Sequence, residues 1–512
     1  MDIKGIVRNN AYYDSVTLMQ VSRAIEELDV VVRAMVSMGT DMNKELLKAA
    51  NLMKEEFETA KPSDLIIAFV VKEDSDFTNV IEVIDKKLNE KIKDDNVEEV
   101  PPSSISSAIK KNPNANISII SLPGIYAAQE VRKSLNKGLN VMLFSDNVTL
   151  EDEISLKKLA HEKGLLMMGP DCGTAIINNI GLCFANEIRK GNIGVVGASG
   201  TGTQEVTVLI DHLGGGVSQV LGTGGRDLSK EVGGIMMLDS LNALNQDNET
   251  QVIVLISKPP VEEVADKIIN EAKNSIKQIV VCFINSEERE SEGNLHFVST
   301  LEDAATLAVK LANGKAPTEL EDDFNISEIQ KQLSQTLKDS QKYVRGLYCG
   351  GTLCDEAASI FGKRLDNVYS NVGKVKRLEN PSISEANSFI DLGDDIFTVG
   401  RPHPMIEPSL RNKRIVEEAL NPETAIVLFD VELGYGSHKN PAKEAVEAIK
   451  EAKILLEQED KNVLFVAYVL GTKEDIQGCD QQVKLLADEG VIVAKSNARA
   501  AKLCLELIGG IN

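Results

Sequence analysis

Four short glycine-rich stretches of this sequence could hold a phosphate group. Each follows an apolar, β-branched run and precedes a segment with apolar residues at helical spacing. A turn of this kind places free backbone N–H groups at the positive end of a helix, where an anion is stabilised. The stretches are GASGTGTQ at 197–204, GTGG at 222–225, CGGT at 349–352 and GYGSH at 434–438.

None of the four stretches is decisive alone. None has the Walker A spacing or the G-x-G-x-x-G pattern, and a glycine after a strand often marks only a tight turn. Their number is the signal, because the ligands of open α/β sheets collect at the carboxyl ends of strands. We therefore expect phosphate to be bound by Ser199, Gly200, Thr201, Gly202, Gly222, Gly224, Gly225, Gly350, Gly351, Gly434, Gly436 and Ser437.

Acid–base chemistry could come from two histidines. His403 lies between two prolines in VGRPHPMIE, close to Arg401, and such an arginine–histidine pair in a rigid loop can bind an anion and move a proton. His438 directly follows GYGS at the start of a predicted helix. We expect His403, His438 and Arg401 to be the catalytic residues. The alternative interpretation is that His403 caps a turn and His438 is a solvated loop residue.

For other reactive residues a structural role is the simpler interpretation. His161 and His212 lie on helical patterns, and His296 lies in NLHFVSTLEDA. Cys172 packs beneath its turn unless a cation or a helix terminus lowers its pKa. Arg226 either forms a phosphate fork or is an exposed arginine. No His, Cys or carboxylate group has metal-ligand spacing, so we predict no metal site and leave open only Mg²⁺ that enters with a phosphate.

Composition excludes several classes of protein. The net charge of −23 and the pI of about 4.8 argue against nucleic acid or an anionic membrane as a partner. The seven cysteines form no CxxC pair, which argues against a disulfide framework and a zinc ribbon. The start MDIKGIVRNN is unlike a signal peptide, and no apolar run reaches the roughly 18 residues of a membrane span. We expect a cytoplasmic protein.

Strand and helix patterns alternate along almost the whole chain, which predicts parallel sheets with helices on both faces. The segment 315–345 interrupts the alternation because it is polar, acidic and poor in strand formers. The expected domains are 1–190, 191–314 and 346–512, with 315–345 as a partly helical linker.

The order of these motifs resembles the α subunit of succinyl-CoA synthetase and the wider acyl-CoA synthetase (NDP-forming) superfamily. The third unit resembles the carboxyl-terminal domain of the same enzyme's β subunit, and the fused arrangement looks like the FdrA family. The resemblance implies a Rossmann-like CoA-binding-type domain followed by two flavodoxin-like parallel-sheet domains. The matching stretches are LLMMGPDCGT, GNIGVVGASGTGTQEV, VLGTGGRDLSKEVGGIMMLDSL, TQVIVLISKPPVEEVADKI, FIDLGDD, TAIVLFDVELGYG, DSVTLMQVSRAI, GRPHPMIEP and LGYGSHKNPA.

In that superfamily, two helix N-termini from different subunits grip a phosphate carried on a mobile histidine. The resemblance implies that Ser199, Gly200 and Thr201 form the first grip. It implies that the turn at 434–438, through Gly434, Gly436 and Ser437, forms the second.

Three departures from the superfamily bear on the reaction. The loop that carries the phosphohistidine is SEERESEG in this chain and contains no histidine. No segment remains for an ATP-grasp domain. RNNAYYDSVTLM stands where the family has the glycine-rich loop for CoA phosphates. ATP-driven CoA ligation by this chain alone is therefore not expected.

A reaction that remains compatible with these departures is one on an acyl phosphate that another enzyme has already formed. The FdrA resemblance implies carbamoyl transfer between carbamoyl phosphate and oxamate or oxalurate in ureide (allantoin) catabolism, with separate partner subunits. The alternatives are an acyl-CoA synthetase subunit of succinate–CoA ligase type, which needs a nucleotide-binding partner, and a non-catalytic metabolite-binding scaffold. No cofactor is required; the resemblance leaves CoA open, and the oligomeric state, a homo-oligomer included, is also open.

Overall fold

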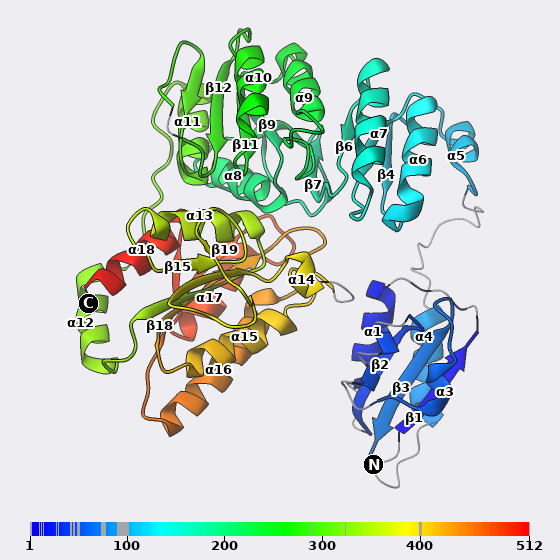
Figure 1. Cartoon of the computed structure of the whole chain (residues 1–512), viewed down its shortest axis with the longest axis vertical. Coiled ribbons are helices and arrows are strands. Elements are labelled where there is room, and N and C mark those ends of the chain that lie inside the picture. Colours follow the sequence, from blue (N-terminus) through cyan, green and yellow to red (C-terminus); the bar gives the residue numbers. More distant parts are fainter. Residues whose placement is uncertain are drawn as a thin grey trace. The chain divides into compact units, whose positions relative to one another are not determined.

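The chain forms two compact units, Met1–Pro101 with Thr398–Pro402, and Pro102–Phe397 with His403–Asn512. Figure 1 traces the chain through both units. This computed structural model describes residues 3–510 except 10, 12, 14, 27, 29, 41–42, 45–46, 49–51, 73–77, 90–101, 288, 323 and 399–401.

The first unit is built on a three-stranded antiparallel sheet with the strand order β1-β3-β2. The central strand β3 is buried along its whole length, because apolar clusters cover both of its faces. The elements are β1 (Ile3–Arg8), α1 (Ser15–Glu26), β2 (Val31–Met38), α3 (Glu55–Glu58), β3 (Leu65–Val71) and α4 (Thr78–Asn89).

Residues 1–190 therefore do not form the single Rossmann-like domain that we expected. β1 and β2 run antiparallel to β3, with Ile3 opposite Val70, whereas a Rossmann sheet is mostly parallel. The apolar runs at 31–38 and 65–71 fit a buried strand of either direction, so their composition could not settle the pairing.

A short parallel sheet opens the second unit, with the strand order β4-β5-β6. It keeps the βαβ connections of half a Rossmann domain, because helices cross over between successive strands. Its elements are α5 (Ile105–Lys111), β4 (Ile117–Ile120), α6 (Gly124–Asn136), β5 (Asn140–Leu143), α7 (Leu150–Glu162) and β6 (Met167–Met168).

A seven-stranded sheet follows, in the order β13-β12-β11-β9-β10-β7-β8. Its strands from β13 to β10 are parallel, and the hairpin β7–β8 adds antiparallel strands at one edge. The elements are β7 (Thr174–Ile177), β8 (Ile180–Cys183), β9 (Lys190–Gly197), α8 (Gly200–His212), β10 (Val217–Gly222), α9 (Ile235–Gln246), β11 (Val252–Ser257), α10 (Glu262–Ala272), β12 (Gln278–Phe283), β13 (Leu295–Phe297) and α11 (Leu301–Asn313).

A second seven-stranded sheet is parallel throughout, in the order β16-β15-β17-β14-β18-β19-β20. The expected linker carries one helix, α12, and its last residues begin β14. The elements are α12 (Ile326–Thr336), β14 (Tyr343–Tyr348), α13 (Gly351–Gly362), β15 (Val368–Ser370), β16 (Lys376–Arg377), β17 (Asn387–Asp391), α14 (Asp395–Thr398), α15 (Ser409–Leu420), β18 (Thr424–Glu432), α16 (Pro441–Gln458), β19 (Leu464–Leu470), α17 (Cys479–Asp488), β20 (Ile492–Ala494) and α18 (Asn497–Gly509).

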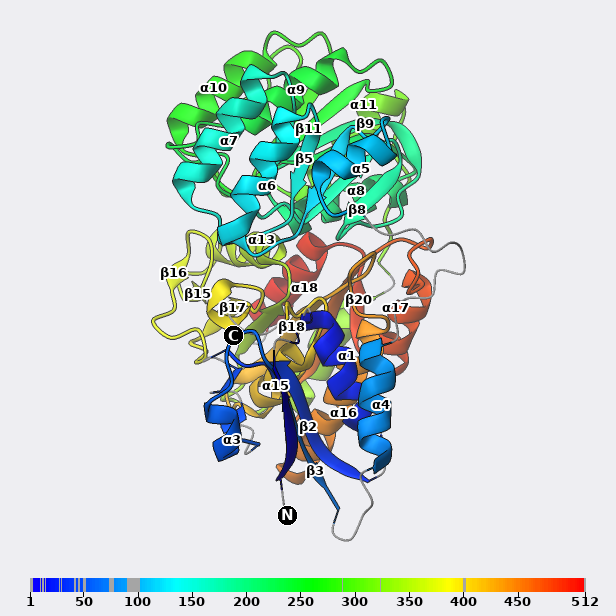
Figure 2. The same cartoon turned by 90° about the vertical axis from the view of Figure 1, so that its right-hand side faces the viewer.

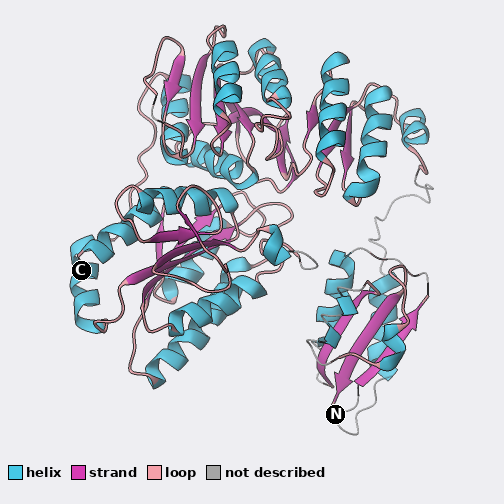
Figure 3. Ribbon diagram, in the orientation of Figure 1, coloured by secondary structure: helices cyan, strands magenta, loops and turns pink. Residues whose placement is uncertain are grey.

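Helices α8 and α11 of the first large sheet pack against α13 and α18 of the second. Their side chains belong to one buried apolar cluster that reaches from Val206 to Ala501. Figures 1 and 2 show this helical layer between the two sheets, and Figure 3 separates the strands from the helices by colour. Because α8 and α13 start at the carboxyl ends of β9 and β14, the layer brings two helix N-termini together.

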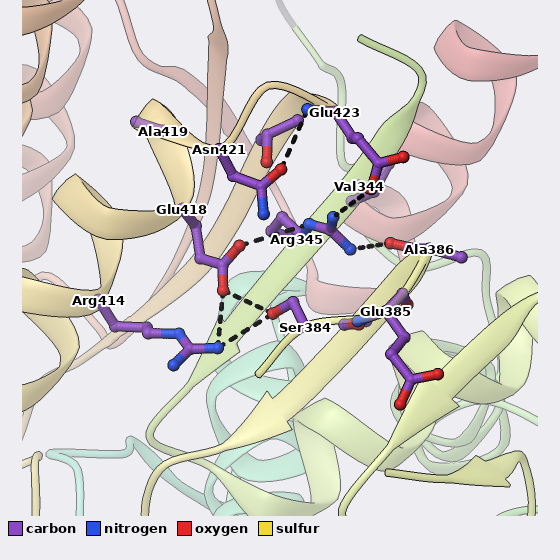
Figure 4. Close-up of polar contacts among 12 residues, drawn as sticks. Val344, Arg345, Ser384, Glu385, Ala386, Arg414, Glu418, Ala419, Asn421 and Glu423 are labelled. Atoms are coloured by element: carbon purple, nitrogen blue, oxygen red, sulfur yellow. Dashed lines mark hydrogen bonds and ion pairs between the residues drawn. The ribbon is translucent and has the colours of Figure 1, made fainter. Parts of the chain in front are cut away.

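A buried arginine fastens helix α15 to the amino end of β14 (Figure 4). The guanidinium of Arg345, only 1% exposed, has its Nε 3.4 Å from Glu418 and donates to the carbonyl of Ala386. Glu418 also accepts from Arg414 at 2.7 Å and from Ser384 at 2.5 Å. Since the glycine-rich turn lies at the other end of β14, this network is structural.

Candidate active site

The N-termini of α8 and α13 meet at a pair of hydroxyl groups. Ser199 caps α8 by accepting from the amide of Gly202 at 3.1 Å, and its Oγ also shares a hydrogen bond with Thr352 Oγ1 in the first turn of α13. A Cβ at Gly202 would lie 2.9 Å from Thr352 Cγ2, and one at Gly350 would lie 3.1 Å from Thr201 Cβ. The close approach of the two helices therefore requires glycine at both positions.

Both helix starts leave backbone N–H groups free. The first-turn amides of a helix have no carbonyl within the helix to bind. Within the described structure, no acceptor is found for the amides of Gly200 and Thr201 on α8, or of Gly351 and Thr352 on α13. Free amides at two adjacent helix N-termini can bind a phosphate or an acyl phosphate.

Two carboxyl groups at the end of β18 set the shape of the α13 turn. Asp430 accepts from the amides of Cys349 and Gly350 at 2.8 and 2.9 Å. Glu432 lies directly beneath Gly350, where any Cβ would collide with its carboxyl group. Burial raises the pKa of both acids, and the neighbouring Asp430 raises that of Glu432 further. The turn is therefore held by side chains that are themselves shielded from solvent.

Lys258 and Asp391 flank the same helix start from opposite sheets. Lys258 follows β11 and is exposed, and its Nζ lies 3.6 Å from the position that a Cβ on Gly351 would take. The same Cβ would collide with Asp391 Oδ2 at the end of β17. Sequence analysis missed both residues, although each directly follows or ends a strand, as the ligands of open sheets require.

The turn at 434–438 is docked elsewhere. The amide of Gly434 donates to Gln477 at 3.1 Å, and that of Tyr435 donates to the carbonyl of Ala185 at 2.8 Å. Gly436 packs against the ring of Phe184. The turn that meets the Ser199 turn is therefore the one at 349–352. We correct our expectation that the turn at 434–438 forms the second grip, because the amides of Gly434 and Tyr435 already have acceptors.

One buried asparagine still connects the two turns. Asn186 accepts from the side chain of Gln204, near the start of α8, at 3.1 Å. Its Nδ2 donates to the carbonyl of Leu433 at 3.1 Å and to Asp475 at 2.8 Å. The turn at 434–438, which contains Ser437, is therefore connected through Asn186 to the first half of α8.

The GTGG turn has a packing role. Gly222 packs against Cys172, and Gly224, with a φ of +82°, packs against the carbonyl of Pro170. Gly225 faces open space. The helix start that follows is already filled, since Asp227 accepts from the first amides of α9 at 3.1 and 2.9 Å. We expected the GTGG turn to bind phosphate, but the amides of Met236 and Met237 in the helix that follows already donate to Asp227.

The neighbours of that turn follow the structural interpretation. Arg226 forms an ion pair with Glu153 at 2.9 Å and donates to a backbone carbonyl at 2.7 Å. Burial raises the pKa of the Cys172 thiol to about 12, so this thiol stays protonated. Partial loss of solvation is the main cause that raises the pKa of Asp171 to about 6, and the negative charges of Asp146 and Asp395 add to it.

The two expected catalytic histidines lie near each other, and the ring of His403 packs against Gly393, two residues after Asp391. The amide of Met405 donates to His403 Nδ1 at 3.2 Å, and the amide of His438 donates to the carbonyl of Met405 at 2.8 Å. Burial lowers the pKa of His403 to about 4, so its ring is neutral at pH 7. The ring stacks near Phe184, with centroids 6.5 Å apart. Arg401 lies outside the described residues.

Comparisons with known proteins agree with this architecture. The CoA binding domain family matches residues 188–284, and the CoA-ligase family matches residues 347–506. The family described as AllF, heavy metal-associated domain, matches residues 1–102. The chain is also 28% identical, over 197 residues, to a succinate–CoA ligase [ADP-forming] subunit alpha of Staphylococcus epidermidis, which covers 37% of this chain and 63% of that subunit.

The comparison with solved structures matches two kinds of enzyme. A dinucleotide forming acetyl-coenzyme A synthetase 1 of Ca. Korarchaeum cryptofilum is 15% identical, with a TM-score of 0.34 over 81% of this chain and 87% of that one. An ATP citrate lyase of Methanothrix soehngenii is 12% identical, with a TM-score of 0.35 over 80% and 84%.

Fold, family matches and motifs define a protein of the acyl-CoA synthetase (NDP-forming) superfamily. The whole chain, moreover, is 45% identical over 515 residues to YahF of Escherichia coli (strain K12), covering 99% of each protein. It belongs to the same FdrA-like family as YahF.

The heavy metal named in the description of one matching family does not fit the residues present, and one edge of the fold disfavours CoA. Residues 1–101 contain no cysteine or histidine, and no group of three His, Cys, Asp or Glu side chains that could hold a metal occurs in the described structure, so a heavy metal lacks thiolate and imidazole ligands there. CoA carries a diphosphate, whereas the carboxyl edge of β4–β6 presents Asp146 and Asp171, which repel it. As for a bilayer, the described helices are too short or too polar to cross one.

Proposed function

We propose that this chain is a subunit of an enzyme that transfers an acyl group, most simply a carbamoyl group, between phosphate and a nitrogen nucleophile. The observation that carries the proposal is the contact between the α8 and α13 starts at Ser199 and Thr352. Two sets of free amides then face one anion, and no nucleotide or phosphohistidine is needed if the acyl phosphate arrives ready made.

The transfer would use these amides on the leaving group. The nucleophile attacks the acyl carbon, the bond from that carbon to the phosphate oxygen breaks, and the phosphate keeps the electron pair. Its oxygens gain negative charge in the transition state, and preorganised donors aimed at them lower the barrier. Lys258, exposed beside Gly351, supplies a cation for the same oxygens.

Oxamate and oxalurate are the acceptor and product that we propose, in the breakdown of ureides such as allantoin. The FdrA-like family and the AllF description of residues 1–102 support this assignment. Separate partner subunits are proposed as well, because the matched succinate–CoA ligase relatives are themselves named as subunits.

A second candidate is an acyl-CoA ligase subunit whose nucleotide site lies on another polypeptide. The matches to the CoA binding domain and CoA-ligase families favour it. The acidic edge of β4–β6 opposes CoA at that edge, so this candidate takes second place and we derive no step through CoA.

One product assay separates the two candidates. The tagged full-length chain, purified with whatever subunits accompany it, is incubated with carbamoyl phosphate and oxamate, and in parallel with ATP, CoA and succinate. We expect phosphate and oxalurate in the first mixture and no thioester in the second. A thioester in the second mixture alone would support the ligase, and products in neither would overturn both.

A further inference from the structure

The carboxyl group of Asp391 lies at the start of helix α13. It is the last residue of β17 and is only 7% exposed. Its Oδ1 accepts from the amide of Gly393 at 2.9 Å. Its Oδ2 accepts no hydrogen bond from any described residue, and it faces Gly351 so closely that a Cβ there would collide with it. An oxygen of a buried carboxyl side chain, with no hydrogen bond from a described residue, therefore faces the first residue of the helix.

Lys258 approaches the same residue from the other sheet. Its Nζ lies 3.6 Å from the same Cβ position on Gly351. Within the described structure this ammonium has no hydrogen bond and no carboxylate at ion-pair distance, and its side chain is exposed. Because residue 351 is a glycine, a small space remains beside it, with the carboxyl group of Asp391 on one side and the ammonium of Lys258 from the other domain on the other.

The other groups around Asp391 are mostly acidic. Asp394 lies on the same loop, Asp430 and Glu432 lie on β18, and the thiols of Cys349 and Cys354 lie on either side of the α13 turn. Burial, with Asp394 and Asp430 adding to it, raises the pKa of Asp391 to about 7, and Lys258 acts in the opposite direction. Both protonation states are therefore accessible near neutral pH.

We propose that Asp391 is the proton-transfer residue of this site and that Lys258 stabilises its carboxylate form and the departing phosphate. The inference rests on the proposed function. When the bond from the acyl carbon to the phosphate oxygen breaks, the neutral carboxyl group donates its proton to that oxygen. The nucleophile loses one proton on forming its new bond to carbon, and this proton returns to the Asp391 carboxylate. Phosphate leaves as the monoprotonated dianion, and Asp391 is restored.

Asp391→Asn tests the proton transfer, because the amide keeps the shape and loses the acid. We expect phosphate release from carbamoyl phosphate with oxamate to fall about 100-fold or more, the scale of general acid catalysis. Binding of inorganic phosphate should change less than about 3-fold. The wild-type rate should fall as pH rises through about 7, and this limb should vanish in the variant. Asp394→Asn, on the same turn, is the matched control. It should keep the rate at low pH and the falling limb, and it should move that limb only slightly, to lower pH, because the Asp394 charge is one of the smaller causes of the raised pKa of Asp391.

Lys258→Met provides a second test that does not disturb the core, because Lys258 is exposed. Removing the cation should raise the pKa of Asp391, so the falling limb should move to higher pH. Phosphate binding should weaken about 10-fold, and Lys258→Arg should restore both. This pair of variants decides the matter if Asp391→Asn does not fold.

The outcomes separate this inference from the function on which it rests. A wild-type chain with its subunits that releases no phosphate overturns both. An active wild type whose Asp391→Asn variant keeps rate and pH profile overturns the inference alone. An unmoved limb in Lys258→Met, with phosphate binding unchanged, does the same.

Discussion

The hydroxyl groups of Ser199 and Thr352 are hydrogen-bonded to each other although 153 residues separate them in the chain. Each belongs to the start of a helix that follows a strand of a different seven-stranded sheet. The contact thus joins the two large domains at a place where both have backbone amides without acceptors among the described residues. In the amino-acid sequence, no motif near either residue marks the other as its partner.

Gly202→Val is expected to separate the two helix starts. A side chain there would meet Thr352 Cγ2 at 2.9 Å and Ser199 Oγ at 2.8 Å. Overpacking of this kind costs about 1–3 kcal/mol, so the protein should still fold. Affinity for inorganic phosphate, measured by calorimetry, should fall at least about 10-fold, since two sets of amides would no longer face one anion.

Gly225→Ala is the matched control for that variant. It lies in another glycine-rich turn, and nothing lies within 4 Å of its added Cβ. Phosphate affinity should be unchanged. A loss as large in Gly225→Ala as in Gly202→Val would mean that the GTGG turn takes part in binding.

Glu205 should make the stability of the protein depend on pH. It is completely buried on α8, where burial and the nearby Glu356 raise its pKa from 4.5 to about 8. The folded chain holds this proton more tightly than the unfolded chain. The stabilisation is therefore complete below about pH 4.5 and is lost as pH rises to about 8.

Glu205→Gln removes this dependence. The variant should match the wild type near pH 4.5 and exceed it in thermal stability near pH 8. The measurement is the melting temperature against pH, with the exposed Glu457→Gln as control. Equal shifts of both variants across the range would show that Glu205 is ionised in the folded protein.

Glu418→Ala should destabilise the second unit strongly. It leaves the guanidinium of Arg345 buried without its closest carboxylate, and removing one partner of a buried ion pair typically costs about 3–5 kcal/mol. Chemical unfolding followed by circular dichroism measures the loss. Phosphate affinity should be preserved under native conditions, because the network lies at the amino end of β14 (Figure 4).

The double variant Arg345→Met with Glu418→Leu checks this explanation. An apolar pair leaves no buried charge, so it should lose much less stability than Glu418→Ala alone. A double variant that is less stable than the single one would show that the network contributes more than charge compensation.

The first unit should bind no heavy metal ion, despite the description of the family that it matches. Residues 1–101 provide neither thiolate nor imidazole. The full-length chain, equilibrated with Zn²⁺ or Cu⁺ and then dialysed, should retain no metal that is sensitive to substitutions in residues 1–101. Stoichiometric metal lost on replacing Met35 or Met53 would contradict this prediction.

Strands with continuous apolar runs were predictable from the sequence. Residues 193–196 and 425–431 read as buried strands and form β9 and β18. The glycine turns after these strands were predictable for the same reason, because punctuating residues mark strand ends. Local pattern did not settle strand direction in the first unit, where long-range pairing places Ile3 opposite Val70.

The composition of the site was harder to predict. Turns 349–352 and 434–438 look alike in sequence, and what distinguishes them is the hold of Asp430 on the first and of Gln477 on the second. Lys258 and Asp391 meet only because two sheets present their carboxyl ends to the same helix start. Such convergence depends on the packing of whole domains.

The most direct test is calorimetric titration of the full-length chain with carbamoyl phosphate and with inorganic phosphate. It compares the wild type with Ser199→Ala combined with Thr352→Val, and with Ser104→Ala, which removes a serine cap from the distant helix α5. The predicted result is binding of both ligands that the double variant weakens at least about 10-fold and the control preserves. Equal affinity in all three proteins, or no binding by the folded wild type, would contradict the account.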